Sequence, residues 1–164
     1  MHLFSEVLRC IKRGAIFRIT CPDASLAYSA YLREDYHFWR PHHHWHTKEQ
    51  LLLSTINTSA STMIDSDLVA KTSDTMVCQT LTENGIEEAF DKLSPEKSKE
   101  IINAHPQSHD AWFTEKKLVN MLLNSGFTNV WTSRFGQSRS VIMRDTGYFD
   151  KTRPDISLYV EATR

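Results

Sequence analysis

The chain has 164 residues, of which 40% are hydrophobic and 24% charged, so it is long and apolar enough to enclose a core of its own. Its 19 Lys and Arg nearly balance its 20 Asp and Glu, and the net charge of −1 argues against nucleic acid as a partner. No apolar run approaches the roughly 20 residues that cross a bilayer, so no membrane association is expected. The N-terminus lacks a signal-peptide pattern, and three cysteines without metal-like spacing indicate reduced thiols in a cytoplasmic protein.

The first 23 residues predict a helix followed by a strand. The helix has one apolar stripe at i, i+3, i+4 and i+7, formed by Phe4, Val7, Leu8 and Ile11. Gly14 can adopt the left-handed conformation that follows a helix. The β-rich residues 15–20 come next, and we expect the strand to end at Cys21-Pro22-Asp23 because a proline donates no ladder hydrogen bond.

The same order of elements returns near the C-terminus. Thr114 is a suitable N-cap for a helix that closes on Gly126, and the β-rich residues 130–135 follow. A helix that ends on glycine and leads directly into a strand is the helix-to-strand step of a layered α/β sheet. Residues 157–162 predict a last strand. A long polar loop without a helix precedes it, which favours antiparallel pairing of the two late strands.

The middle of the chain, residues 24–108, predicts helices. Thr47-Lys48-Glu49-Gln50 has the form of a capping box before three leucines. Ser94-Pro95 predicts another helix start, with a cap residue before a proline at the first helical position. Residues 57–80 are rich in Ser, Thr and Asp and give no assignable pattern.

Several stretches, taken in order, resemble one family. Residues 6–19 are similar to a helix, a turn of the Lys-Pro-Gly-Gly kind and a fifth strand, with Arg13-Gly14 in place of Pro-Gly, and Cys21-Pro22-Asp23 is similar to the Val-Pro-Asp that follows. Residues 112–130 resemble a last helix with an Ala-Gly-Phe entry to a sixth strand, and residues 135–139 and 157–162 resemble a pair in bacterial relatives. The family is the class I S-adenosylmethionine-dependent methyltransferases.

The resemblance implies an α/β fold that is a partial Rossmann-like methyltransferase sheet. It would hold strand five and the antiparallel hairpin of strands six and seven, in a single domain of residues 1–164. The parts of this domain would be 1–23 (helix and strand five), 24–108 (helical insertion) and 109–164 (last helix and hairpin). S-adenosylmethionine is the cofactor implied by the resemblance, and no metal is expected.

The cofactor-binding half of that fold is missing from the sequence. The family holds its cofactor on a glycine-rich first turn and on an acid after the next strand. The five glycines here, at positions 14, 85, 126, 136 and 147, never approach Gly-x-Gly spacing. Strands left without neighbours would expose an edge. We therefore expect a homodimer or a companion chain to complete the sheet, while a remnant that folds poorly and a small independent α/β fold stay open.

The histidine cluster is the most unusual stretch. His42 and His46 are four residues apart and could share a helix face as metal ligands, but Pro41 and the Thr47 cap favour a loop. In the resembled fold this region borders the substrate pocket. His44 and His46 are therefore the candidate catalytic bases, which would take a proton from an acceptor, and His42 is a candidate substrate-binding residue.

Two further residues are candidate substrate ligands. Asp23 follows a strand at its carboxyl end, where open α/β sheets bind ligands, although a cap for a helix over Ala24–Arg33 is the more common role of such a residue. Arg139 could hold an acidic group of a substrate or simply solubilise a loop. The predicted function is methyl transfer to a small-molecule or sugar-like acceptor by an incomplete or partner-dependent chain. The alternatives are a non-catalytic interaction module or remnant that pairs through its sheet edge and, more remotely, a histidine-based metal protein.

Overall fold

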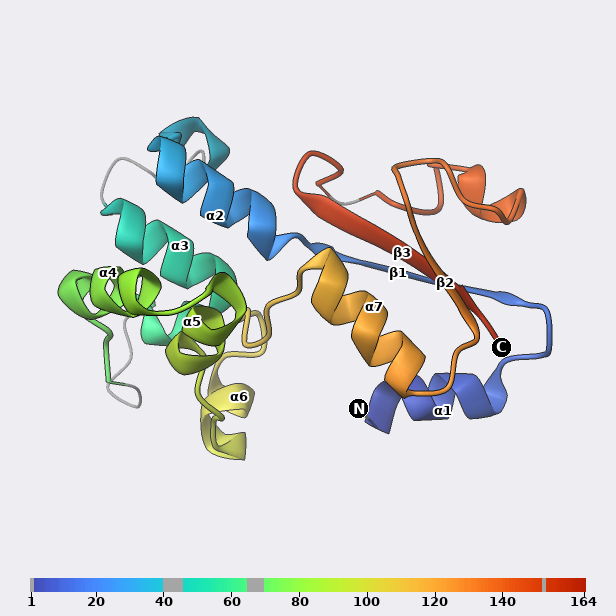
Figure 1. The fold of residues 1–164 in the computed structure, drawn as a ribbon, viewed down its shortest axis with the longest axis horizontal. Coiled ribbons are helices and arrows are strands. Elements are labelled where there is room, and N and C mark those ends of the chain that lie inside the picture. Colours follow the sequence, from blue (N-terminus) through green and yellow to red (C-terminus); the bar gives the residue numbers. More distant parts are fainter. Residues whose placement is uncertain (1, 40–45, 65–69, 152) are drawn as a thin grey trace. The chain divides into compact units, whose positions relative to one another are not determined.

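The computed structural model describes residues 2–39, 46–64, 70–151 and 153–164. The protein is mixed α/β, with seven α-helices and one three-stranded sheet among these residues. The chain divides into two compact units (Figure 1). The sheet unit joins Met1–Asp23 to Phe113–Arg164, and the helical unit is Ala24–Trp112. None of the helices in the described residues is long and apolar enough to cross a bilayer.

The sheet unit is built from two helices and three strands: α1 (His2–Cys10), β1 (Ile16–Pro22), α7 (Glu115–Asn124), β2 (Asn129–Ser133) and β3 (Ser157–Thr163). The strand order is β1-β3-β2, and β3 is antiparallel to both neighbours. Strands β1 and β2 therefore run in the same direction, with β3 between them. The prediction that the three β-rich runs share one sheet, with the last two antiparallel, is confirmed.

One face of the sheet packs against α1 and α7. Phe17 of β1 stacks on Phe127 with ring centroids 5.7 Å apart and meets Phe4 of α1 edge-on at 6.4 Å. Leu118 and Leu122 of α7 are fully buried in the same core. The remaining buried members come from β3 and alternate along it, as a strand with one apolar face requires: Leu158, Val160 and Ala162.

Two details of the sheet unit differ from the sequence prediction. Strand β1 continues through Pro22, which pairs with Ser157, because β1 is an edge strand and proline is tolerated there. Gly14 has the expected positive φ of 76°, but α1 already ends at Cys10, so this glycine belongs to the turn into β1. Gly126, with φ 101°, does follow the C-cap of α7 directly.

The helical unit contains α2 (Ala24–Arg33), α3 (Lys48–Ile56), α4 (Asp74–Glu83), α5 (Ile86–Leu93) and α6 (Lys99–Ala104). Short 3-10 turns occur at Tyr36–Trp39 and Thr58–Ala60, and a third, Ile142–Arg144, lies in the sheet unit. The core of the helical unit centres on fully buried side chains of α3 and α5: Leu51, Leu52, Leu53, Ile56 and Phe90.

Helix capping confirms one predicted start and corrects another. The Thr47 hydroxyl accepts a hydrogen bond from the Gln50 backbone N–H at 3.2 Å, as the capping box predicts. The predicted start at Ser94-Pro95 is wrong. Ser94 is the C-cap of α5, and its N–H bonds back to the Asp91 carbonyl. Helix α6 begins later, at Lys99, with Ser98 as its N-cap.

Gln50 of α3 binds the described part of residues 57–80, the segment in which the sequence shows no assignable pattern. Its side-chain NH2 donates to the Thr72 carbonyl at 2.9 Å and to the Asp74 carboxylate at 2.7 Å. Its side-chain oxygen accepts the Thr62 N–H at 2.9 Å. One buried amide thus ties α3 to the residue two positions after the 3-10 turn Thr58–Ala60 and to the start of α4, the two described elements that this segment contains.

Candidate functional site

A polar pocket of about 710 Å³ lies where β1 and β2 end and β3 begins. Asp23 follows β1 directly, and its backbone N–H donates to the Ile156 carbonyl at 2.8 Å, which extends the β1–β3 ladder by one residue. Arg134 follows β2, and Glu115 enters from the first turn of α7. The carboxyl ends of two parallel strands therefore bring two acids and a guanidinium to one pocket, the position at which open α/β sheets bind ligands.

The pocket offers groups for a hydroxyl-rich molecule. Glu115 is oriented by the Thr132 hydroxyl, which donates to its carboxylate at 2.8 Å. No described residue pairs with the guanidinium of Arg134, which is exposed. The Phe135 ring, 43% exposed, supplies an apolar surface beside these polar groups. Carboxylates, a guanidinium and an aromatic ring together suit a small polar molecule that also carries C–H faces.

A buried ionic network lies on the sheet face opposite α1 and α7. Arg18 of β1 binds the Asp150 carboxylate at 2.7 Å and the Glu161 carboxylate of β3 at 2.8 Å. The exposed fractions of these side chains are 5% for Arg18, 3% for Asp150 and 0% for Glu161. Arg18 also donates to the Ser133 hydroxyl and, at 2.9 Å, to the Arg134 carbonyl. One guanidinium thus joins all three strands to the long loop between β2 and β3.

Further hydrogen-bond donors satisfy the Asp150 and Glu161 carboxylates. Burial disfavours the charged form of Glu161, but the Arg139 backbone N–H at 3.0 Å, the Ser138 hydroxyl and Arg18 outweigh it and lower the pKa of Glu161. The Trp131 indole N–H donates to the same carboxylate at 3.0 Å. Burial of Asp150 is likewise outweighed by Arg18 and by a backbone N–H, so its pKa also lies below the ordinary value. Both acids are therefore ionised, and the network carries a net charge of −1.

The structure places the five predicted site residues in different surroundings. His42 and His44 lie outside the described residues. His46 is half-buried just before the Thr47 cap of α3, in the helical unit. Asp23 lines the polar pocket, and Arg139 does not: its guanidinium carbon lies 4.0 Å from the centre of the Trp131 ring.

Sequence reasoning missed Asp150, Glu161 and Arg18 as a set. A usable signal existed, because Arg18 and Glu161 each interrupt a β-rich run that otherwise carries few charges. Asp150 gave no signal, since it lies in a loop without periodicity. Cys21 packs on the apolar face of the sheet, where burial and the nearby Asp23 charge raise its pKa to about 12 and disfavour the thiolate. Among the described residues no group of three or more His, Cys, Asp or Glu side chains could hold a metal ion.

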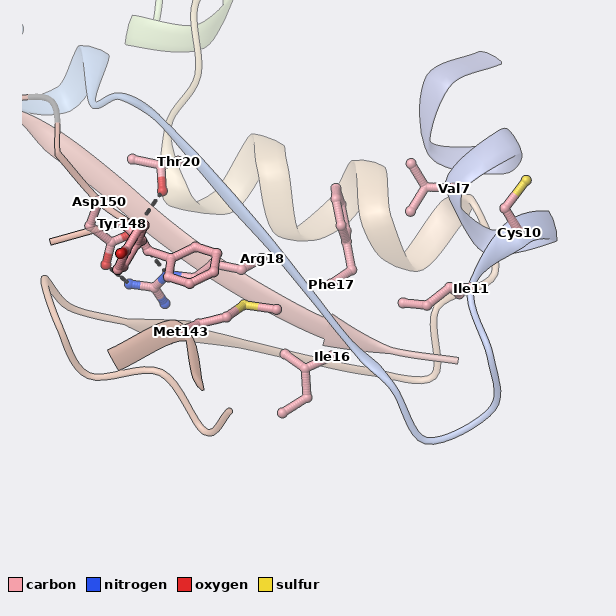
Figure 2. A pocket seen from close by; sticks show the side chains of 11 residues that line it. Val7, Cys10, Ile11, Ile16, Phe17, Arg18, Thr20, Met143, Tyr148 and Asp150 are labelled. Atoms are coloured by element: carbon pink, nitrogen blue, oxygen red, sulfur yellow. Dashed lines mark hydrogen bonds and ion pairs between the residues drawn. The ribbon is translucent and has the colours of Figure 1, made fainter. Parts of the chain in front are cut away.

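A second, more apolar groove of about 650 Å³ follows β1 (Figure 2). Val7 and Cys10 of α1 and Ile11, which follows the helix, lie on one side of the strand, and Met143 and Tyr148 of the long loop lie on the other. Strand β1 is an edge of the sheet, so this groove follows backbone that no other described strand covers.

The chain matches no protein-family model, no curated protein and no solved structure. The function is therefore inferred from the arrangement of the sheet unit, from its polar pocket and from the groove along β1.

Proposed function

We propose that this chain is the acceptor-binding part of a class I S-adenosylmethionine-dependent methyltransferase and that a second polypeptide supplies the cofactor-binding part. The observation that carries the proposal is the arrangement of the sheet: β1 and β2 are parallel, α7 leads into β2, and the antiparallel β3 lies between them. This arrangement agrees with strand five and the closing antiparallel hairpin of the resembled fold. The helical unit then corresponds to an insertion between strand five and the last helix.

The polar pocket is the proposed acceptor site. Methyl transfer requires that an acceptor oxygen or nitrogen be held in line with the methyl carbon and that its proton be removed. Asp23 would hold the acceptor hydroxyl or amine, and Arg134 would hold a second polar group on the same molecule. Arg134 takes the part that the sequence assigned to Arg139, because only Arg134 lines the pocket. The assignment of His44 or His46 as the base and of His42 as a ligand stays a prediction.

The donor side of the reaction is provided by S-adenosylmethionine, whose sulfonium group releases the methyl group. The described residues offer no glycine-rich turn that could hold it, since Gly14, Gly126 and Gly136, the three glycines with positive φ, lie far apart in the sequence. The chain is thus expected to bind the cofactor only within a complex.

The test uses the tagged chain isolated at its native level together with whatever it binds. Equilibrium dialysis against methyl-labelled S-adenosylmethionine compares that assembly with the purified chain. We expect the assembly to bind and the purified chain to stay without cofactor at millimolar concentration. Failure of both to bind would overturn the methyltransferase proposal. Binding by the purified chain would overturn the need for a second polypeptide.

A non-catalytic interaction module is the second candidate, and the groove along the open edge of β1 favours it. An assembly that forms stably but never binds cofactor would support this candidate in place of the first.

A further inference from the structure

Along the open edge of β1, the backbone groups of alternate residues point away from β3, and no other described strand pairs with them. Opposite residues of an antiparallel pair alternate between hydrogen-bonded and non-hydrogen-bonded positions. The Asp23 N–H bonds the Ile156 carbonyl, so the odd-numbered residues of β1 face β3. The backbone N–H groups of Ile16, Arg18 and Thr20 consequently point away from the sheet. Pro22, which has no N–H, falls at one of these outward positions.

Apolar side chains flank this edge on both faces of the sheet. Val7, Ile11 and Phe17 line the groove on the face covered by α1, and Met143 and Tyr148 line it on the opposite face (Figure 2). Tyr148 is 79% exposed, and Ile142, the residue before Met143 in the sequence, is 76% exposed. Contiguous exposed apolar surface of this kind marks an interaction site.

The groove offers no unpaired charge to a ligand among the residues that line it. The charged side chains that line it are Arg18 and Asp150, which bind each other through a bidentate pair with distances of 2.7 and 3.1 Å and are almost closed to solvent. A strand seated on β1 would therefore place its alternate side chains against apolar walls on both faces. Strands with this requirement are apolar at every position, as in sheets covered on both sides.

We propose that the β1 edge binds an extended segment of a separate companion chain that carries apolar side chains on both of its faces. The inference deepens the proposed function, since it states the chemistry of the strand that the second polypeptide would supply. Main-chain hydrogen bonds to β1 would hold the segment, and the two walls of the groove would select its side chains.

The strands of a second copy do not meet this requirement. Antiparallel pairing of two β1 strands would bring Arg18 and Thr20, both polar, to one face of the sheet. If Arg18 of one copy lay opposite Arg18 of the other, two guanidinium groups would face each other. Strand β2, the other edge, alternates Trp131 and Ser133 with Val130 and Thr132. Pairing of β1 with β2 of a second copy is also a heterologous contact, which need not close into a defined oligomer.

The probe is a synthetic peptide of seven consecutive valines between lysines, N-methylated at alternate residues so that only one edge can pair. The control peptide replaces every second valine by serine. Amide exchange of the full chain, followed by NMR, reports on Ile16, Arg18 and Thr20. Alkylation of Cys10, which lines the groove and is exposed, gives a second readout, and Cys78 of the helical unit is its internal control because it is also exposed.

We expect the valine peptide to slow exchange at the three outward amides and alkylation of Cys10 at least about tenfold, with Cys78 unchanged. The serine peptide should bind at least about tenfold more weakly. Met143→Glu should abolish the protection, whereas Leu3→Glu, at a position that is 66% exposed and outside the groove, should leave it intact.

Equal protection by both peptides, or by neither, would overturn the inference. Protection that grows with protein concentration in the absence of peptide, together with sedimentation as a dimer, would show that a second copy occupies the edge and would overturn it too. These readouts need no cofactor. A protein that passes them but whose assembly never binds S-adenosylmethionine would refute the proposed function alone.

Discussion

Arg18 and Glu161 are directly opposite residues of β1 and β3, and their side chains form an ion pair of 2.8 Å that is closed to solvent. Charged groups so placed depend on one another, because each would be strongly disfavoured in the interior without its partner. The pair joins β1 to β3, and the polar pocket lies where β1 ends and β3 begins. The pair therefore helps to hold in place the strands that form the pocket.

Replacement of Arg18 by methionine should destabilise the sheet unit by about 3–5 kcal/mol, since it leaves the Asp150 and Glu161 carboxylates buried without a cation. Urea unfolding measures the change. Arg9→Met is the matched control, because Arg9 pairs with Glu6 on the exposed surface of α1 and should contribute nothing measurable. A change as small as that of the control would contradict the buried network.

Acid should destabilise the protein through the same carboxylates. Their pKa values lie below the ordinary values of 3.8 for Asp150 and 4.5 for Glu161. A group whose pKa is lower in the folded state contributes stability that is complete above its unfolded pKa and is lost as the pH falls toward its folded one. The free energy of unfolding should therefore drop below a pH of about 4.5.

The Arg18→Met variant reverses the sign of this contribution. Without the guanidinium, burial and mutual repulsion raise the pKa of both acids, so protonation relieves the folded state. The difference in stability between the natural protein and the variant should shrink as the pH falls from 7 to about 4. Urea titrations at several pH values follow it, and a constant difference would argue against the assigned charges.

Gln50→Met should cost the helical unit about 1–3 kcal/mol, because the thioether cannot replace the bonds to Thr62, Thr72 and Asp74. Gln79→Met, the same exchange on the exposed face of α4, should change the midpoint of thermal unfolding little. Similar midpoints for the two variants would show that the buried amide does not hold this segment.

Thr114→Ala should destabilise α7 by about 1 kcal/mol, because its hydroxyl accepts the Lys117 backbone N–H at 3.2 Å. Thr114→Ser keeps this acceptor and should restore most of the loss. Thermal unfolding of the two variants separates the cap from general packing, and equal losses would refute the capping role.

Asp23→Asn tests the polar pocket. Asparagine caps a helix as well as aspartate does, so the stability should be unchanged. If Asp23 holds the acceptor, the KM for the acceptor in the assembled enzyme should rise by about tenfold or more, the equivalent of about 1.4 kcal/mol. Unchanged kinetics would remove Asp23 from the site.

Local patterns predicted the elements whose causes are local. The helix over Ala24–Arg33 has the bounds that the sequence indicates, and the Thr47 and Thr114 caps bond as expected, because a cap depends on residues three positions apart. Ser94 shows where this logic stops. A serine before proline fits a helix start, but α5 runs up to Ser94 and makes it a C-cap.

By itself, the sequence determined the two helix-to-strand steps, the β-rich runs that form the sheet and the balanced charge. Apolar periodicity and capping act over a few residues, and a single chain displays them directly. Only the tertiary structure decided that Asp150 and Glu161 share one guanidinium, that Arg134 and not Arg139 lines the pocket, and that β1 is left as an open edge. These relationships join residues more than 100 positions apart, such as Arg18 and Glu161, and arise from strand register, which no local pattern records.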